Sequence, residues 1–393
     1  MSLSVSKRVQ RVKPSPTMAV TALAAEMRAA GRDVIGLGAG EPDFDTPEHI
    51  KQAAIEAIRE GKTKYTAVDG TVELKQAIID KFQRDNELDY APDQILVSSG
   101  GKQTCYNICQ ALLGDGDEVI IPAPYWVSYP AMAMLADATP VEVLAGIEQG
   151  FKLTPKVLEA AITDRTRLMF LNSPSNPTGS AYTRAELQAL GQVLVAHPDI
   201  VIATDDMYEH IYWADEPFTS FVQACPELYE RTITINGVSK AYAMTGWRIG
   251  YAGGPPAIVQ AMKKIQSQST SNPCSISQAA SVAALTGDQS CLAERNQAFK
   301  ERHDYVVAAL NEIPGFECAE GAGTFYAFPN VSAAIAAKGA ADDTAFAELL
   351  LNEAEVAIVP GSAFGAPGYI RLSYATSVEI LQEAIARIAK FVG

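Results

Sequence analysis

Short apolar runs alternate with helical patterns from Val34 to about residues 290–300, and this alternation limits the choice of fold. Six runs are rich in β-branched and aromatic residues and are closed by small or polar ones: QILVSSGG, DEVIIPAPYW, RLMFLNSPSNPTG, IVIATDDMYE, RTITINGVSK and GWRIGYAGG. Nearly continuous apolar strands separated by helices are typical of a mainly parallel sheet with helices on both faces. The chain is therefore predicted to have an α/β fold.

Three of the intervening segments show the spacing of amphipathic helices. In TPEHIKQAAIEAIREG, Thr46 is the expected N-cap, Pro47 the first helical residue and Gly61 the stop. The segment TVELKQAIIDKFQRDNEL has the same spacing, and KQTCYNICQALLG ends in Gly114. Beyond residues 290–300 the pattern changes to two helices around a short strand region.

The charge balance excludes some partners. The 393 residues include 31 Lys and Arg against 46 Asp and Glu, which gives a formal net charge of −15. Surfaces that bind nucleic acid or anionic membranes need clustered Lys and Arg, so we expect neither partner and favour small molecules. No run approaches the ~18 apolar residues of a membrane-spanning helix, and the first residues lack the apolar core of a secretory signal. We expect a cytoplasmic protein.

The cysteines and histidines indicate no metal or disulfide framework. The six cysteines form no CxxC pair, and the four histidines show no metal-ligand spacing. Reduced, mostly buried thiols are expected, and a zinc site is not.

Polar residues follow the predicted strands where each strand ends. Ligands of parallel α/β sheets bind beyond the carboxyl ends of the strands. The polar residues at these ends therefore form one candidate site: Gly100, Gly101, Lys102, Trp126, Asn176, Asp205, Tyr208 and Lys240.

The glycine turn before KQTCYNICQALLG is a possible anion site. Backbone N–H groups and the helix dipole at Gly100, Gly101 and Lys102 suit a phosphate, although a turn of this kind also uses glycine for steric reasons alone. The turn does not match a P-loop. In GLGAGEPD, Glu41 stands where a dinucleotide fingerprint needs its last glycine, so a nicotinamide-dependent enzyme is disfavoured.

Asp205 and Asp206 end a strongly hydrophobic run. A carboxylate in this place usually caps the next helix. The alternative is a buried acid that keeps a cationic heterocyclic nitrogen protonated, with Tyr208 close by.

Lys240 and Arg248 lie in SKAYAMTGWRIGY, the most informative segment. A lone lysine is usually solvated, but the small and apolar neighbours of Lys240 argue against a surface loop. Desolvation disfavours the ammonium form, which makes a lysine a better nucleophile for Schiff-base chemistry.

Two further features leave alternatives open. Asn172, Asn176 and Gly179 in FLNSPSNPTG are typical turn residues. Arg371 lies inside the apolar run GYIRLSYA and needs an anionic partner, which is either a structural carboxylate or a substrate carboxylate.

Taken together, these segments resemble the class I aminotransferases, pyridoxal 5′-phosphate enzymes of fold type I. The matching segments follow the family order over almost the whole chain: GAGEPDFDTP, KYTAVDG, SSGGKQ, PYWVSYP, NSPSNPTG, the run ending in Asp205, SKAYAMTGWRIGY and IRLSYA. Within the family, the chain looks most like bacterial aspartate aminotransferases of the subgroup that includes prephenate-using members.

The resemblance assigns roles around the cofactor ring. Lys240 would hold the cofactor as a Schiff base and move the proton between substrate and cofactor. Asp205 would pair with the pyridinium nitrogen, Tyr208 and Asn176 would bond the phenolic oxygen, and Trp126 would stack on the ring. Trp126 and Asn176 would also lie beside the substrate.

The same resemblance assigns the phosphate and a shared dimer site. The phosphate would be bound by the glycine turn at Gly100 and Gly101, the backbone N–H of Lys102 and the side chain of Arg248. Tyr65 would reach it from the other subunit of a homodimer. The resemblance also implies that Gly237 replaces a phosphate-binding serine of other branches, at the loss of one hydrogen bond.

The substrate would be a dicarboxylate. Arg371, backed by the Gly40 backbone, would bind the α-carboxylate. No arginine is present in KKIQSQSTSNP, where other aspartate aminotransferases place one, so Lys102 is assigned to the distal carboxylate. Ser15 and Lys13 are weaker candidates, and in the relatives Lys13 is linked to prephenate use.

The implied architecture is a large α/β/α domain of residues 46–299, with a mainly parallel seven-stranded sheet, and a small α+β domain of residues 1–45 and 300–393. The implied reaction is ping-pong transamination between aspartate and 2-oxoglutarate. The alternatives are an aromatic or alanine aminotransferase or a β-eliminating lyase on the same scaffold, and, less favoured, a cofactor-binding regulator without turnover.

Overall fold

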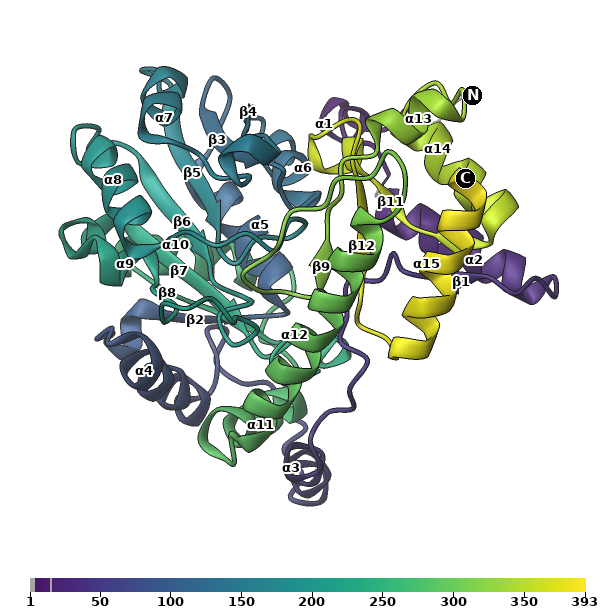
Figure 1. Ribbon diagram of the computed structural model, residues 1–393. Helices are drawn as coiled ribbons and strands as arrows, with labels where there is room; N and C mark the ends of the chain where they lie inside the picture. The colour runs from purple at the N-terminus through teal and green to yellow at the C-terminus, as the bar shows by residue number, and fades with distance from the viewer. Residues whose placement is uncertain (1–3, 15) are drawn as a thin grey trace.

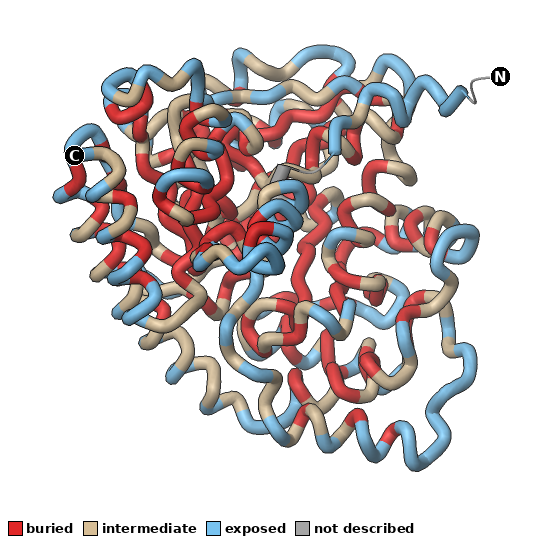
Figure 2. The backbone as a smooth tube through the Cα atoms, turned by 90° about the vertical axis from the view of Figure 1, so that its right-hand side faces the viewer, coloured by how far each residue is buried: buried red, intermediate tan, exposed pale blue. Residues whose placement is uncertain are grey.

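The computed structural model of the protein describes residues 4–14 and 16–393, and its elements form two parts that lie side by side (Figure 1). One part is built on a large sheet, and the other combines segments from the two ends of the chain. Buried segments run through the interior of both parts, while the outer helices carry the exposed residues (Figure 2).

The large sheet has seven strands in the order β2-β8-β7-β6-β5-β3-β4. Only β8 runs antiparallel to its two neighbours, and the other pairs are parallel. This confirms the predicted mainly parallel α/β fold. The strands span the following residues: β2 Ile95–Ser98, β3 Glu118–Ala123, β4 Thr139–Leu144, β5 Thr166–Asn172, β6 Val201–Asp205, β7 Thr232–Gly237 and β8 Gly250–Gly253.

Helices cover both faces of this sheet because its strands are apolar on both sides. In β5, Leu168 and Phe170 pack with α5, α6 and α10, whereas Met169 and Leu171 pack with α8 on the opposite face. The helices of this part are α3 Glu48–Arg59, α4 Val72–Asn86, α5 Gly101–Leu112, α6 Ser128–Leu135, α7 Pro155–Ala161, α8 Arg184–Val195, α9 Phe221–Ala224, α10 Pro256–Ser267 and α11 Ser275–Thr286.

The predicted cap of α3 is wrong. The helix begins at Glu48 after Pro47, and the Thr46 side chain makes no capping hydrogen bond. Its hydroxyl instead donates to the carbonyl of Ala243 at 2.7 Å and accepts from Trp247 Nε1 at 3.0 Å. Thr46 therefore ties the chain before α3 to the loop that follows Lys240.

The second part is a small α+β arrangement. Strand β1 (Ile35–Gly36) pairs with β10 (Val356–Ala357), and β11 (Val359–Pro360), β12 (Ile370–Ser373) and β9 (Tyr326–Ala327) form a three-stranded sheet. Its helices are α1 Lys7–Gln10, α2 Pro16–Ala29, α13 Ser332–Ala337, α14 Asp343–Leu349 and α15 Val378–Val392. The long helix α12 (Ser290–Asn311) crosses the expected boundary at 299/300 without a break, and the division into two domains remains a prediction.

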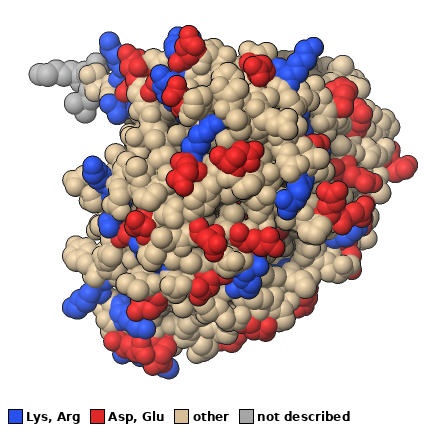
Figure 3. All heavy atoms as spheres, turned by 90° about the vertical axis from the view of Figure 1, so that its left-hand side faces the viewer, with Lys and Arg blue, Asp and Glu red and all other residues tan. Residues whose placement is uncertain are grey.

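Two surface findings bear on partners. On the face drawn in Figure 3, Lys and Arg are interspersed with Asp and Glu and do not gather into a basic patch. No helix among residues 4–14 and 16–393 is long and apolar enough to cross a membrane.

Candidate active site

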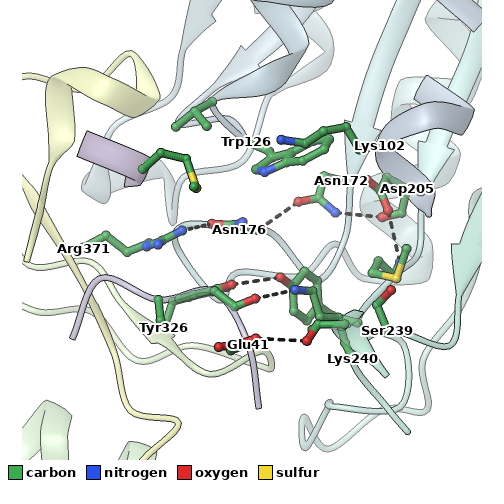
Figure 4. A pocket seen from close by; sticks show the side chains of 18 of the residues that line it. Glu41, Lys102, Trp126, Asn172, Asn176, Asp205, Ser239, Lys240, Tyr326 and Arg371 are labelled. Atoms are coloured by element: carbon green, nitrogen blue, oxygen red, sulfur yellow. Dashed lines mark hydrogen bonds between the residues drawn. The ribbon is translucent and has the colours of Figure 1, made fainter. Parts of the chain in front are cut away.

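A cavity of about 500 Å³ opens between the two parts, at the carboxyl ends of the strands. It brings together ten of the predicted site residues: Gly40, Gly101, Lys102, Trp126, Asn176, Asp205, Tyr208, Lys240, Arg248 and Arg371. Figure 4 shows most of these side chains pointing into one space. Seven of these ten residues belong to the strand-end set, so the structure brings together nearly all of that set.

Lys240 lies three residues after β7, and its ammonium group donates a hydrogen bond to the carbonyl of Gly40 (Figure 4). Burial lowers the pKa of Lys240 to about 8, and the nearby positive charge of Arg371 adds to the shift. A lysine with this pKa has a sizeable fraction of free amine at neutral to alkaline pH, so it is suited to nucleophilic and proton-transfer chemistry.

Asp205 is the last residue of β6 and is buried. Burial raises its pKa, while hydrogen bonds from the Tyr129 hydroxyl at 2.7 Å and from the backbone N–H of Met207 at 3.2 Å favour the ionised form. The helix-cap interpretation is wrong, because no helix follows Asp205 directly and α9 begins only at Phe221. The site thus holds a buried acid that a cationic ligand would stabilise.

The glycine turn at the start of α5 forms an anion cradle with Arg248. A Cβ atom on Gly100, whose φ is +87°, would lie 2.0 Å from Arg248 Nη2. Only glycine lets the guanidinium approach this turn, and Gly101 then begins the helix with free N–H groups. Burial lowers the pKa of Lys102, with Arg248 adding to the shift, and its ammonium lies 5.0 Å from the Trp126 ring centroid.

The structure accounts for the glycine at position 237. A Cβ atom there would lie 3.0 Å from Met207 Cε and 3.1 Å from the Ile249 carbonyl oxygen. A serine would therefore require its neighbours to shift.

Arg371 is 2% exposed and forms no ion pair with a carboxylate of the described residues. Its Nη1 donates to Asn176 Oδ1 at 2.9 Å and its Nη2 to the Gly38 carbonyl at 2.7 Å, while its buried Nε has no partner. The structural salt bridge that the sequence left open is thus not found in the described part of the chain. A buried, unpaired guanidinium is suited to a ligand carboxylate.

Residues 32–388 match the family described as aminotransferase class I and II. The chain belongs to this aminotransferase family. It is 59% identical to the aspartate/prephenate aminotransferase of Nitrosomonas europaea, over 98% of this chain and 99% of that protein. Among solved structures it resembles the aspartate aminotransferase from Rhizobium meliloti, with a TM-score of 0.95, 50% identity and coverage of 100% of this chain and 99% of that one. The aspartate aminotransferase from Thermus thermophilus with maleate gives a TM-score of 0.93 at 44% identity, covering 99% and 100%.

The enzymes of this family depend on pyridoxal 5′-phosphate, and the cavity of this aminotransferase fits that group. Three separate features suit its functional groups. The amine of Lys240 suits the aldehyde, and the buried carboxylate of Asp205 suits the ring nitrogen. The cradle formed by the Gly100 turn and the Arg248 guanidinium suits the phosphate. All three features border one cavity of about 500 Å³, which has room for the cofactor and a small substrate.

Two aromatic residues of the aminotransferase site were not predicted. The Tyr326 hydroxyl lies 3.0 Å from the Tyr208 hydroxyl, and its ring centroid lies 4.4 Å from the Arg371 guanidinium carbon. Tyr129 binds Asp205 and packs edge-on against Trp126, with 5.3 Å between the ring centroids. Trp126 precedes α6 and Tyr129 lies on it, so helix periodicity does not connect the two residues in the sequence.

Three of the predicted residues that the structure describes lie outside the lining of the cavity: Gly100, Tyr65 and Lys13. Tyr65 is 90% exposed, and Lys13 is exposed on the segment before α2. Ser15 lies outside the described residues. Met18 and Thr21 of α2 do line the cavity, so the N-terminal segment borders the site although Lys13 does not.

Proposed function

We propose that this enzyme is an aspartate aminotransferase that uses pyridoxal 5′-phosphate to transfer the amino group of aspartate to 2-oxoglutarate. The observation that supports the specificity is the pair of cations, Lys102 and Arg371, on different sides of the cavity that contains Lys240 (Figure 4). One cation is enough for an α-carboxylate. A second cation bordering the cavity favours a dicarboxylate because an apolar side chain would leave its charge unpaired.

Pyridoxal 5′-phosphate supplies an aldehyde that accepts the amino group and a ring that accepts electrons from the substrate Cα. Lys240 would bind the aldehyde carbon and then carry the proton from the substrate Cα. Asp205 would keep the ring nitrogen protonated, and Tyr208 and Asn176 would bind the phenolic oxygen. The phosphate would be held by the glycine turn at Gly100 and Gly101, by the backbone N–H of Lys102 and by the side chain of Arg248. Trp126 would cover the ring.

Arg371 would orient the substrate by a bidentate contact to its α-carboxylate, with Lys102 at the distal carboxylate. The structure gives Arg371 the carbonyl of Gly38 as its backbone partner, whereas the carbonyl of Gly40 accepts from Lys240. The Thermus thermophilus relative is described with maleate, which is itself a dicarboxylate. Closure over such a substrate would exclude water from the amine.

The enzyme would act as a homodimer in the cytoplasm. The exposed Tyr65 belongs to a group of exposed apolar side chains on one stretch of the chain that includes Ile58 and Val72. Such side chains suit a subunit interface, and Tyr65 would there reach the phosphate of the partner subunit. A sedimentation measurement that gave a species of 42.0 kDa rather than twice that mass would contradict the shared site.

The function is tested with a panel of amino donors and 2-oxo acids. We expect aspartate, glutamate and their 2-oxo acids to react with the highest kcat/KM. The panel includes prephenate as an amino acceptor because relatives are named for it. Alanine and phenylalanine should react at least about tenfold more slowly. A profile led by phenylalanine or alanine, or elimination without transfer, would favour the alternative activities.

The same panel with Lys102→Ala tests the distal carboxylate. We expect kcat/KM for aspartate to fall about 10- to 10²-fold, in line with about 1.5–3 kcal/mol for a hydrogen bond to a charged group, while the value for alanine changes less. Lys152→Ala, which breaks a surface ion pair with Glu186, is the control. An unchanged ratio of aspartate to alanine would refute the assignment of Lys102.

A further inference from the structure

The turn that follows β6 sends two adjacent side chains in opposite directions. Tyr208 lines the cavity, while Glu209 is buried away from it, with 3% of its side chain exposed. The Glu209 carboxylate forms an ion pair with Lys81 of α4, whose side chain is only 1% exposed. A buried charge pair therefore lies directly behind the turn that contains Tyr208, on residues that do not line the cavity.

The Glu209 carboxylate is held by donors from two segments, α4 and β7. Asn236 at the end of β7 donates to Oε1 at 2.8 Å, and Asn86 of α4 donates to Oε2 at 2.8 Å. Lys81 donates to Asn86 Oδ1 at 2.7 Å as well as to Glu209. Burial alone would raise the pKa of Glu209, but the charge of Lys81 and these hydrogen bonds keep it below its usual value.

The same cluster includes two further titratable groups. His210 Nε2 lies 3.4 Å from carboxylate oxygens of both Asp85 and Glu209, and Asp85 lies 3.9 Å from the Lys81 ammonium. The ligand atoms of Asp85, Glu209 and His210 lie within 4.8 Å of one another, a spacing that would also suit a metal ion. Because the Lys81 ammonium already faces both carboxylates, the cluster has its own cation.

The backbone of the turn connects Glu209 to the site. The N–H of Asp206 donates to Ile235 O of β7 at 2.9 Å, the N–H of Glu209 to Asp206 O at 3.0 Å, and the N–H of Ile211 to Tyr208 O at 2.8 Å. Tyr208 and Glu209 share a planar peptide unit, so a shift of one residue moves the other.

A buried ion pair of this kind is a poor source of stability. Its desolvation cost often cancels the attraction, and its best-attested use is to select one arrangement among competing ones. We propose that Lys81 and Glu209 are positioning residues that fix Tyr208 and Asp205 relative to the cofactor. This inference rests on the proposed function, because it assumes pyridoxal 5′-phosphate at these two residues.

The test uses the double variant Lys81→Met/Glu209→Gln, which removes both charges at nearly constant volume and leaves no lone buried ion. Three quantities are measured: the dissociation constant of pyridoxal 5′-phosphate, the pH midpoint of the absorbance change of the bound cofactor, and the melting temperature. We expect a folded protein whose dissociation constant rises about tenfold. Its pH midpoint should move in the same direction as in Tyr208→Phe.

A double-mutant cycle separates positioning from general damage. If the pair acts through Tyr208, adding Lys81→Met/Glu209→Gln to Tyr208→Phe changes the pH midpoint by much less than in the wild-type background. Fully additive effects would overturn the proposal. So would a lower melting temperature with a wild-type dissociation constant and midpoint, because that result describes a purely structural pair.

Two further variants keep the test decisive. Leu190→Ala opens a cavity in the buried face of α8 and should lower the melting temperature without moving the midpoint. If the charge-free double variant does not fold, Asn236→Ala removes one hydrogen bond to Glu209 and should move the midpoint by a smaller amount in the same direction; no movement would overturn the proposal. Failure of the wild-type chain to bind pyridoxal 5′-phosphate would instead overturn the proposed function.

Discussion

Lys240→Ala is expected to abolish transamination and the absorbance of covalently bound cofactor. The amine of Lys240 lies in the cavity beside Arg371, and no other lysine of the described residues borders it except Lys102. Positioned proton transfer alone contributes 10²–10⁴-fold, so we expect kcat to fall by about 10⁴-fold or more with aspartate and 2-oxoglutarate. The measurements are initial rates of oxaloacetate formation and the spectrum after addition of pyridoxal 5′-phosphate.

Lys240 also makes a structural contact, and Lys240→Arg separates this contact from the chemistry. An arginine keeps a positive donor for the Gly40 carbonyl but cannot act as a free amine in proteins. We expect Lys240→Arg to be as inactive as Lys240→Ala while retaining a near wild-type melting temperature. Appreciable turnover by either variant would show that Lys240 is not the catalytic amine.

The pattern of strand ends predicted many of the residues that line the cavity, because the fold brings those ends together. Asp205 ends β6, Lys240 follows β7 and Gly101 follows β2, so three distant segments converge at one edge of the sheet. The net charge of −15 led us to expect no polyanion partner, and that expectation remains a prediction. It gave no sign of the cationic cavity, since Lys102 and Arg371 are too few to change the total.

Other parts of the fold left no clear trace in the sequence. Strand β4 was absent from the apolar runs because it is an edge strand with partly exposed residues and Pro140 in its second position. Tyr326 lies on a two-residue strand of the second part, too short for any periodicity. Thr46 looked like a helix cap because its alternative partners, Ala243 and Trp247, are distant in sequence.

The contact between Lys81 and Glu209 is a further one that could not be predicted from the sequence. Lys81 lies in DKFQRDN, where a charged helix face would ordinarily be solvated. It is buried because α4 packs its polar stripe against the turn after β6, over 100 residues later in the chain. Pairing of this kind depends on tertiary packing and is invisible to local patterns.

Asp205→Asn should separate two effects of this buried acid: a lower stability of the cofactor-free protein and a tighter binding of the cofactor. Burial raises the pKa of Asp205 in the free protein, so the ionised carboxylate costs stability at neutral pH. For a carboxyl group with a raised pKa in the folded state, its contribution to stability is present at low pH and lost as the pH rises through that pKa. We therefore expect the cofactor-free variant to be at least as stable as the cofactor-free wild type at pH 7.

Pyridoxal 5′-phosphate should reverse that order. A cationic ring nitrogen stabilises the ionised form of Asp205, so the cofactor raises the melting temperature of the wild type more than that of Asp205→Asn. Because the cofactor prefers the ionised form of Asp205, the affinity of the wild type for the cofactor should decline as the pH falls through the raised pKa of Asp205. This decline should be much weaker in the variant. Turnover should drop about 10²–10³-fold, which corresponds to the 2–5 kcal/mol for truncating one partner of a buried charge pair. Equal gains in melting temperature for the two proteins would show that Asp205 does not face a cationic ring nitrogen.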